Sequence, residues 1–165
     1  MLRATAALIA SLFSLAGCAT VPQSAPTPTI YVMRHLNTPA GVTNPDLTND
    51  GQLAAVALVD WFKHRDPPAV IYVSNTKRAQ QTAAPLARTL GIAPKVYDPA
   101  DTPALIANIM REAHAVLVVG HSNTVPEIIE RLGGQRPAPL VHEDFGDIWQ
   151  LKRSPKETLK FRVQN

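Results

Sequence analysis

Cysteine is almost absent from this sequence of 165 residues, because Cys18 is the only one. A single cysteine excludes an internal disulfide framework and any cysteine-based zinc finger. Charged residues make up only 18%, the formal net charge is +3, and no run of five or six like charges occurs. This charge pattern is not typical of a nucleic-acid-binding protein. Beyond the N-terminal segment no apolar stretch reaches the roughly 18 residues of a membrane-spanning helix.

Internal repeats of 20–50 residues are also missing, which excludes solenoid and propeller architectures. What the sequence does contain is a hydrophobic content of 45%. That content is enough to build a core, so disorder is excluded as the dominant state. A chain of this length is expected to form one domain.

The N-terminal segment has the features of a secretory signal peptide at residues 1–17. Arg3 supplies a minimal positive region, and residues 4–16 form an apolar region too short to span a bilayer comfortably. The letters LAGC at 15–18 look like a bacterial lipobox, in which the cysteine becomes the first mature residue and carries acyl chains. Cys18 is therefore the predicted lipidation site. The alternative is an ordinary signal peptide, with Cys18 as an incidental buried thiol.

The lipobox reading divides the rest of the chain in two. Residues 18–29 are the lipidated cysteine and a tether rich in proline and threonine, and residues 30–165 are the folded domain. Several acyl chains on one residue anchor a protein firmly. We therefore expect a protein attached to the bacterial envelope and facing the periplasm. The residue that follows the cysteine is Ala19 and not an aspartate, which resembles the outer-membrane default of Gram-negative lipoproteins.

Strand and helix patterns alternate along residues 30–165. Short apolar runs rich in β-branched residues predict strands, and apolar residues at helical spacing predict helices, with Thr48 as a cap and Gly91 as a stop. Pro85, inside one helical pattern, predicts a kink or a restart. The predicted strands are 30–33, 69–73, 94–97, 115–119 and a hairpin of 148–152 with 159–163 around residues 154–155, and the predicted helices are 50–64, 77–90, 102–113 and 126–132.

This alternation predicts the α/β class, as a single-domain three-layer α/β/α sandwich with a mostly parallel sheet. Ligands bind beyond the carboxyl ends of the strands in such sheets. Arg34 and His35 follow the first strand, Arg78 lies beyond the second, and His121 follows the fourth. Guanidinium groups bind phosphate oxygens, and a neutral imidazole is a nucleophile toward phosphorus. These four residues therefore predict a phosphate site.

At these residues the sequence resembles the histidine phosphatase superfamily, the phosphoglycerate-mutase-like group. The resemblance follows the whole domain in order, through YVMRH at 31–35, NPDLTxxG at 44–51, SNTKRAxQTA at 74–83, VVGHSN at 118–123 and the late segment 144–151. It implies that His35 attacks phosphorus to form a phosphohistidine, which water then hydrolyses. It also implies that Arg34, Arg78 and His121 hold the phosphoryl group, with His121 as the second catalytic histidine.

The sequence departs from the family pattern after Arg34 and His35. Leu36 stands where the family usually has Gly or Ala, and we expect its side chain to face the pocket rather than to pack into the core. Asn37 stands where an acidic pair or Glu-Thr is common. It is predicted to donate hydrogen bonds to phosphate oxygens, as Thr38 also could.

The proton donor to the leaving group has three candidates. In many relatives it is a carboxylate after the third strand, and Asp101 is the preferred residue there, with Asp98 as its neighbour in the same segment. Both have structural alternatives, because Asp98 precedes a proline and Asp101 precedes a helix. Glu127, six residues past His121, is the third candidate.

The remaining conspicuous residues are expected to be structural. His64, His114 and His142 have no partner at metal-ligand spacing, so they are taken as surface residues, and neither a metal nor another cofactor is predicted. Ser74 is taken as a helix cap in preference to a hydroxyl that faces the pocket, and Trp149 as core.

The sequence therefore predicts a phosphomonoester hydrolase. Only 42 residues separate Arg78 from His121, which leaves no room for a capping domain, so the expected substrate is a phosphorylated small molecule or envelope component. We expect a monomer that contacts the membrane through its lipid and does not bind nucleic acid. The alternative is a lipoprotein of the same fold that binds phosphate or a phospholigand without turning it over.

Overall fold

The computed structural model describes residues 27–153 and 156–163. The predicted signal peptide, Cys18 and most of the predicted tether lie outside these residues, as do residues 154–155 of the predicted hairpin. Within the described ranges no helix has the length and apolar character needed to cross a membrane.

Six strands form one sheet in the order β3-β2-β4-β1-β5-β6. Three neighbouring pairs are parallel, namely β1 with β4, β4 with β2, and β2 with β3, whereas β5 is antiparallel to both β1 and β6. The sheet is therefore mostly parallel in its central part, as the sequence predicted. The strands are β1 (Ile30–Arg34), β2 (Val70–Ser74), β3 (Lys95–Tyr97), β4 (Val116–Gly120), β5 (Asp147–Arg153) and β6 (Lys156–Arg162).

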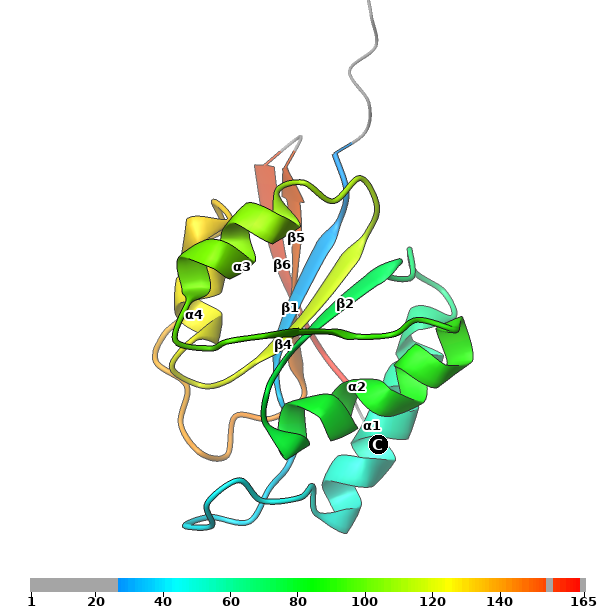
Figure 1. Ribbon diagram of the computed structural model, residues 1–165, viewed down its shortest axis with the longest axis vertical. Coiled ribbons are helices and arrows are strands. Elements are labelled where there is room, and N and C mark those ends of the chain that lie inside the picture. Colours follow the sequence, from blue (N-terminus) through cyan, green and yellow to red (C-terminus); the bar gives the residue numbers. More distant parts are fainter. Residues whose placement is uncertain (1–26, 154–155, 164–165) are drawn as a thin grey trace, which may run out of the picture.

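Helices cover both faces of the sheet (Figure 1). On one face α1 (Asn49–Phe62) and α2 (Lys77–Leu90) pack against alternate strand residues such as Met33 and Val119. On the other face α3 (Thr102–Ile109) and α4 (Val125–Arg131) pack against the residues between them, such as Val32 and Val118. Successive strand residues point to opposite faces, so the central strands are buried on both sides. The predicted three-layer α/β/α architecture is confirmed.

The helix boundaries follow the predicted signals to within two residues, except at the end of the third helix. Thr48 caps α1 by accepting a hydrogen bond from the Gly51 N–H at 3.1 Å, and Gly91 ends α2 with a φ of 67°. Of the two outcomes predicted at Pro85, a kink or a restart, the restart does not occur, because α2 runs through this residue. The third helix ends at Ile109, four residues before the predicted end.

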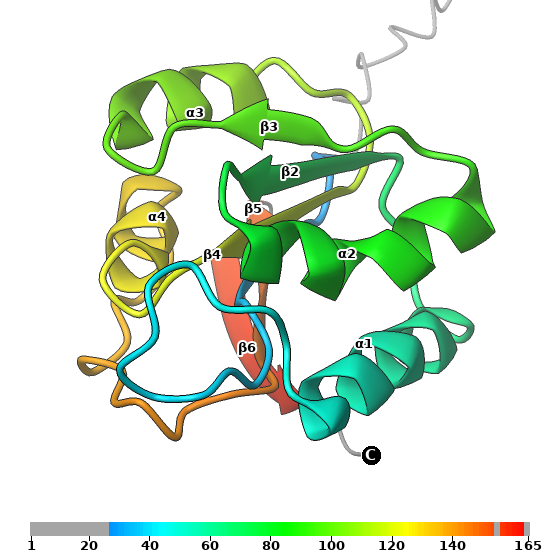
Figure 2. The same ribbon diagram turned by 60° about the horizontal axis from the view of Figure 1, so that its bottom comes forward.

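The connections after β1 and β4 create a crevice at the carboxyl ends of these strands. These two strands are parallel neighbours, yet the chain leaves β1 for α1 on one face and leaves β4 for α4 on the other. In open α/β sheets a ligand crevice forms where connections diverge in this way. Figure 2 shows the loop that precedes α1 and the loop that precedes β5 beside this end of the sheet.

Candidate active site

Two histidines face each other at the carboxyl ends of β1 and β4. The His35 N–H donates to the carbonyl oxygen of Gly120 at 2.9 Å, which continues the ladder between the two strands by one step. His121 follows Gly120 directly, so strand pairing alone brings the two imidazoles together. Their ring centroids are 5.4 Å apart, and both side chains are buried.

The backbone determines the protonation state of His35. Its Nδ1 lies 2.9 Å from the carbonyl oxygen of Leu36, and because a carbonyl only accepts, Nδ1 carries the proton. Nε2 therefore keeps its lone pair. Burial lowers the pKa of His35 to about 3, assisted by the charges of Arg34 and Arg78 and opposed by the Leu36 hydrogen bond. A neutral imidazole with a free Nε2 is the nucleophilic form.

His121 is also held in one neutral form. The Arg78 guanidinium, which can only donate, lies 3.3 Å from His121 Nδ1, so that nitrogen is the acceptor. His121 Nε2 then carries the proton and donates to Ser74 Oγ at 2.8 Å. Burial, with the charges of Arg78 and Arg34, lowers the pKa of His121 to about 4. The Nε2–H is thereby oriented as a donor.

Ser74 is a site residue that the sequence interpretation placed wrongly. It is the last residue of β2 and is fully buried, and its hydroxyl contacts His121 and Thr76 instead of capping α2. Thr76 occupies the position before that helix and makes no side-chain capping bond. The pairing of Val73 with Val119 puts Ser74 beside the end of β4, which is why it reaches His121.

Arg34 connects the site to the loop before β5. Its Nη1 donates to the carbonyl oxygens of Val141, His142 and Asp144. The guanidinium carbon also lies 4.3 Å from the centre of the Phe145 ring, at cation–π distance. Nη1 of Arg34 thus attaches this loop to the edge of the site, and Arg34 also lines the pocket.

The pocket has two adjoining lobes. The first, which we call the phosphate lobe, measures about 490 Å³ and brings together all four predicted basic residues. The second, the outer lobe, measures about 370 Å³, shares Arg34, His35 and Arg78 with the first, and adds His142. The phosphate lobe is lined by Arg34, His35, Thr76, Arg78, Pro99, Ala100, His121, Ser122 and Asn123, and the outer lobe adds Thr38, Pro39, Gly41, Val42, Thr43, Asn44 and Pro45.

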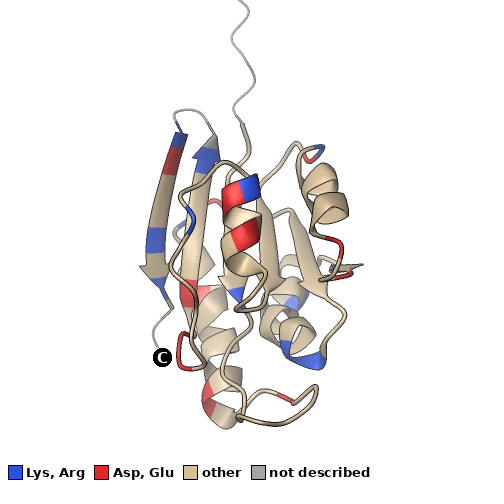
Figure 3. Ribbon diagram, turned by 90° about the vertical axis from the view of Figure 1, so that its left-hand side faces the viewer, with Lys and Arg blue, Asp and Glu red and all other residues tan. Residues whose placement is uncertain are grey.

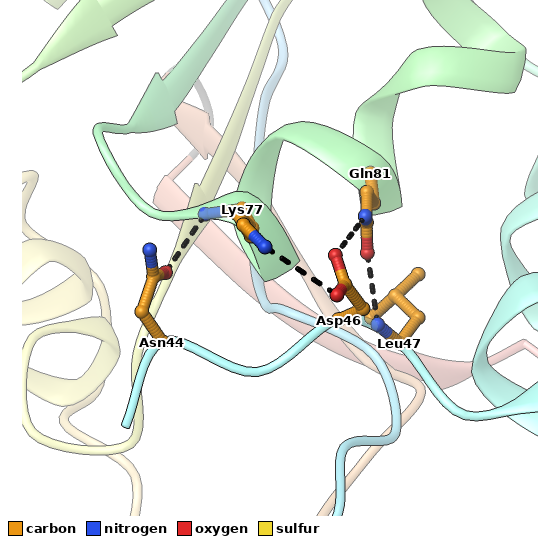
Figure 4. Close-up of polar contacts among 5 residues, drawn as sticks. All are labelled: Asn44, Asp46, Leu47, Lys77 and Gln81. Atoms are coloured by element: carbon orange, nitrogen blue, oxygen red, sulfur yellow. Dashed lines mark hydrogen bonds and ion pairs between the residues drawn. The ribbon is translucent and has the colours of Figure 1, made fainter. Parts of the chain in front are cut away.

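Polar contacts hold the wall of the outer lobe against α2 (Figure 4). The Asn44 side-chain oxygen accepts from the Lys77 N–H at 3.0 Å. Gln81 donates to Asp46 at 2.7 Å and accepts from the Leu47 N–H at 2.8 Å, and Lys77 pairs with Asp46 at 3.5 Å. Because Arg78 lies on the same helix turn, these contacts also position the loop relative to the phosphate lobe.

Leu36 does not face the pocket, so the expectation for this residue is wrong. Its side chain is fully buried in the core between the sheet and the helices α1 and α2. The Leu36 N–H donates to Thr82 Oγ1 at 2.9 Å, which turns the chain inward immediately after His35. The departure from the family pattern therefore does not crowd the pocket.

Asn37 lies next to the site but lines neither lobe. Its carbonyl oxygen accepts from the Thr48 N–H at 2.9 Å, which attaches this loop to the start of α1. Gly51 permits the close approach, since a Cβ there would lie 2.5 Å from the Asn37 oxygen. Phosphate binding by Asn37 stays a prediction, and Thr38 is the neighbour that reaches the outer lobe.

The three carboxylates considered as proton donors are engaged elsewhere. Asp98 accepts from the Ala100 N–H at 2.9 Å, and Asp101 caps α3 by accepting from the Ala104 N–H at 3.0 Å. Glu127 pairs with Arg131 at 2.6 Å on α4, a helix that carries both signs of charge in Figure 3. None of the three lines either lobe.

The lowered pKa values of His35 and His121 predict that the protein loses stability on acidification. Both values lie below the ordinary 6.5, so between pH 6.5 and about 4 the unfolded chain binds more protons than the folded protein. The free energy of unfolding therefore rises with pH across this window, and this contribution to stability disappears as the pH falls through it. His35→Gln is expected to show a smaller difference between urea unfolding at about pH 5 and about pH 7.5 than the wild type does.

The exposed His114 supplies the control for this measurement, because His114→Gln should keep the wild-type pH dependence. Equal pH dependence in the wild type and His35→Gln would contradict the prediction.

A family model matches the N-terminal part of the folded domain. The model of the histidine phosphatase superfamily (branch 1) matches residues 30–100. That range contains β1, β2 and β3 with Arg34, His35 and Arg78.

Among the described residues, no cluster of three or more His, Cys, Asp or Glu side chains suited to a metal ion occurs.

Solved structures share the fold at low sequence identity. The protein histidine phosphatase SixA in complex with tungstate has a TM-score of 0.64 at 20% identity, over 82% of this chain and 97% of the other. A mycobacterial glucosyl-3-phosphoglycerate phosphatase with inorganic phosphate has a TM-score of 0.62 at 16% identity, over 84% and 98%. A phosphoserine phosphatase from Entamoeba histolytica has a TM-score of 0.59 at 14% identity, over 84% and 98%.

A curated relative is similar over part of the chain. The PE-PGRS family protein PE_PGRS11 of Mycobacterium tuberculosis is 41% identical over 75 residues, which are 41% of this chain and 13% of that protein. The chain thus corresponds to only a small part of that relative's length.

Proposed function

We propose that the chain is a member of the histidine phosphatase superfamily and that it hydrolyses phosphomonoesters through a phosphohistidine formed on His35. The observation that carries this proposal is the convergence of Arg34, His35, Arg78 and His121 in the phosphate lobe. Two guanidinium groups supply fixed positive charge, and two buried imidazoles are held neutral in defined tautomers. Phosphoryl transfer depends chiefly on such positioning and charge stabilisation.

In the first step the Nε2 lone pair of His35 attacks phosphorus. The phosphorus–oxygen bond to the leaving group breaks, and the leaving oxygen takes up a proton. Arg34 and Arg78 compensate the charge on the remaining phosphoryl oxygens, and the His121 Nε2–H, which donates to Ser74 in the free site, is placed to donate to one of them.

In the second step water attacks the phosphohistidine. The nitrogen–phosphorus bond breaks, inorganic phosphate leaves, and His35 returns to its neutral form with Nδ1 protonated toward the Leu36 carbonyl. The Nδ1 hydrogen bond keeps the ring in one orientation through both steps, so that Nε2 is presented again for the next cycle.

The substrate enters an open site. Between Arg78 and His121 the chain forms the rest of α2, then β3, α3 and β4, without an inserted segment over the lobes. This openness favours a phosphate group at the surface of a larger envelope component, or a small phosphomonoester.

Hydrolysis of p-nitrophenyl phosphate by the full chain in detergent tests this function. Release of phosphate with burst kinetics, as a covalent intermediate requires, would support it. Binding of inorganic phosphate without turnover would instead support the alternative, a binding protein of the same fold. Leu36 gives no support to that alternative, because its side chain lies in the core.

We also propose that the enzyme lies outside the cytoplasm, attached to the cell envelope by lipid. We expect Cys18 to be the first residue of the mature protein and to carry acyl chains, because LAGC at 15–18 follows an apolar signal-like segment. Mass spectrometry of the N-terminal peptide from cell envelopes should find an acylated Cys18, and Cys18→Ser should abolish the modification. An unmodified Cys18 in the mature chain, or cleavage elsewhere, would contradict this expectation.

A further inference from the structure

His142 lines the outer lobe and is absent from the lining of the phosphate lobe. This lobe takes Arg34, His35 and Arg78 from the phosphate lobe and adds one further ionisable side chain from the described chain, which is His142. All its other added lining residues are uncharged. A substrate whose phosphoryl group occupies the phosphate lobe can extend its leaving group into the outer lobe.

The loop before β5 holds His142 close to the reacting groups. The His142 carbonyl accepts from Arg34 Nη1 at 3.1 Å, so the main chain of this residue is attached to a phosphate-lobe side chain. The His142 ring lies edge-on to Phe145, with centroids 5.4 Å apart, and Phe145 in turn lies 5.8 Å from the His35 ring. The Phe145 ring is thus close to the imidazoles of both His142 and His35 and to the guanidinium of Arg34.

The loop itself is internally braced. The Val141 N–H donates to the Asp144 carboxylate at 2.8 Å, and the Asp144 N–H donates back to the Val141 carbonyl at 3.2 Å. This closed turn occupies the Asp144 carboxylate and presents His142 at its tip, exposed to solvent and to the lobe. Histidine can carry and release a proton near neutral pH, which guanidinium groups cannot do.

We propose that His142 is the general acid that protonates the leaving oxygen, and this assignment rests on the proposed phosphatase function. As His35 Nε2 forms its bond to phosphorus, the phosphorus–oxygen bond breaks and the imidazolium of His142 transfers its proton to that oxygen. The leaving group departs as a neutral alcohol and His142 is left neutral. In the second step neutral His142 takes the proton from the attacking water, which restores the imidazolium. His142 therefore takes the role for which Asp101, Asp98 and Glu127 were considered.

Leaving groups of different basicity test the assignment. A general acid accelerates the departure of a strongly basic oxygen and has little effect on a weakly basic one. His142→Gln in the full chain is therefore expected to lower kcat/KM for phenyl phosphate by about 10²–10³-fold and to leave p-nitrophenyl phosphate within about twofold. His114→Gln is the matched exposed control and should change neither substrate.

The outcomes separate the assignment from the underlying function. Equal losses on both substrates, or no loss on phenyl phosphate, would overturn the role of His142. A loss confined to phenyl phosphate in Asp101→Asn, with His142→Gln unaffected, would transfer the role to Asp101. If the wild type hydrolyses neither substrate, the phosphatase function itself fails and the assignment fails with it. An unchanged urea midpoint in His142→Gln shows that the variant is folded.

Discussion

Replacement of His35 by alanine is expected to lower kcat for p-nitrophenyl phosphate by at least about 10⁴-fold, the scale on which loss of a covalent nucleophile acts in other enzymes. The physical reason is that His35 alone presents an imidazole nitrogen with a free lone pair to the phosphate lobe. Its Nδ1 is bound to the Leu36 carbonyl, whereas the lone pair of His121 is directed at Arg78. The second histidine therefore cannot take over the attack without breaking its contact with Arg78.

Covalent labelling extends this prediction from rate to mechanism. Wild-type protein quenched during turnover should carry an acid-labile phosphoryl group, and His35→Ala should carry none. A His121→Ala variant is expected to form the label and to retain it longer, because it loses the Nε2–H that stabilises the second transition state. His114→Ala, at an exposed position, should behave as wild type. Undiminished turnover or an unchanged label in His35→Ala would refute the phosphohistidine mechanism.

Leu36→Ala is expected to lower the free energy of unfolding by about 2–5 kcal/mol, which is the range for a fully buried leucine. The side chain is completely enclosed by the core that α1 and α2 form against the sheet, so its removal leaves a cavity. Domains are stable by only about 5–15 kcal/mol, so this loss is a large part of the total. Urea unfolding of the wild type and the variant measures it directly.

Activity distinguishes a structural role of Leu36 from a role in the pocket. Because the side chain points away from both lobes, kcat/KM of the folded variant at low temperature should remain within a few-fold of the wild type. Leu53→Ala is the matched control, since Leu53 is 61% exposed on α1 and its removal should cost little stability. Unchanged stability together with raised kcat/KM for bulky substrates would show instead that Leu36 controls access to the phosphate.

Several features of this protein followed from local sequence alone. The strands and helices were identified by patterns that act over a few residues, such as the apolar run of β4, the Thr48 cap of α1 and the Gly91 stop of α2. The convergence of Arg34, His35, Arg78 and His121 was also predictable. Parallel strands end at the same edge of their sheet, so residues that follow those strands must meet whatever their separation in sequence.

The tertiary structure decided where side chains beside that edge point. Ser74 reaches His121 because β2 and β4 pair in one particular register. The local sequence around Ser74 does not indicate that register, and it is equally compatible with a helix cap. Leu36 enters the core because Thr82, on a helix more than forty residues away, accepts its N–H. His142 reaches the outer lobe because Arg34 donates to the main-chain carbonyl of His142, 108 residues further along the chain. Local patterns determine elements and strand ends, whereas these orientations depend on contacts between segments far apart in the chain.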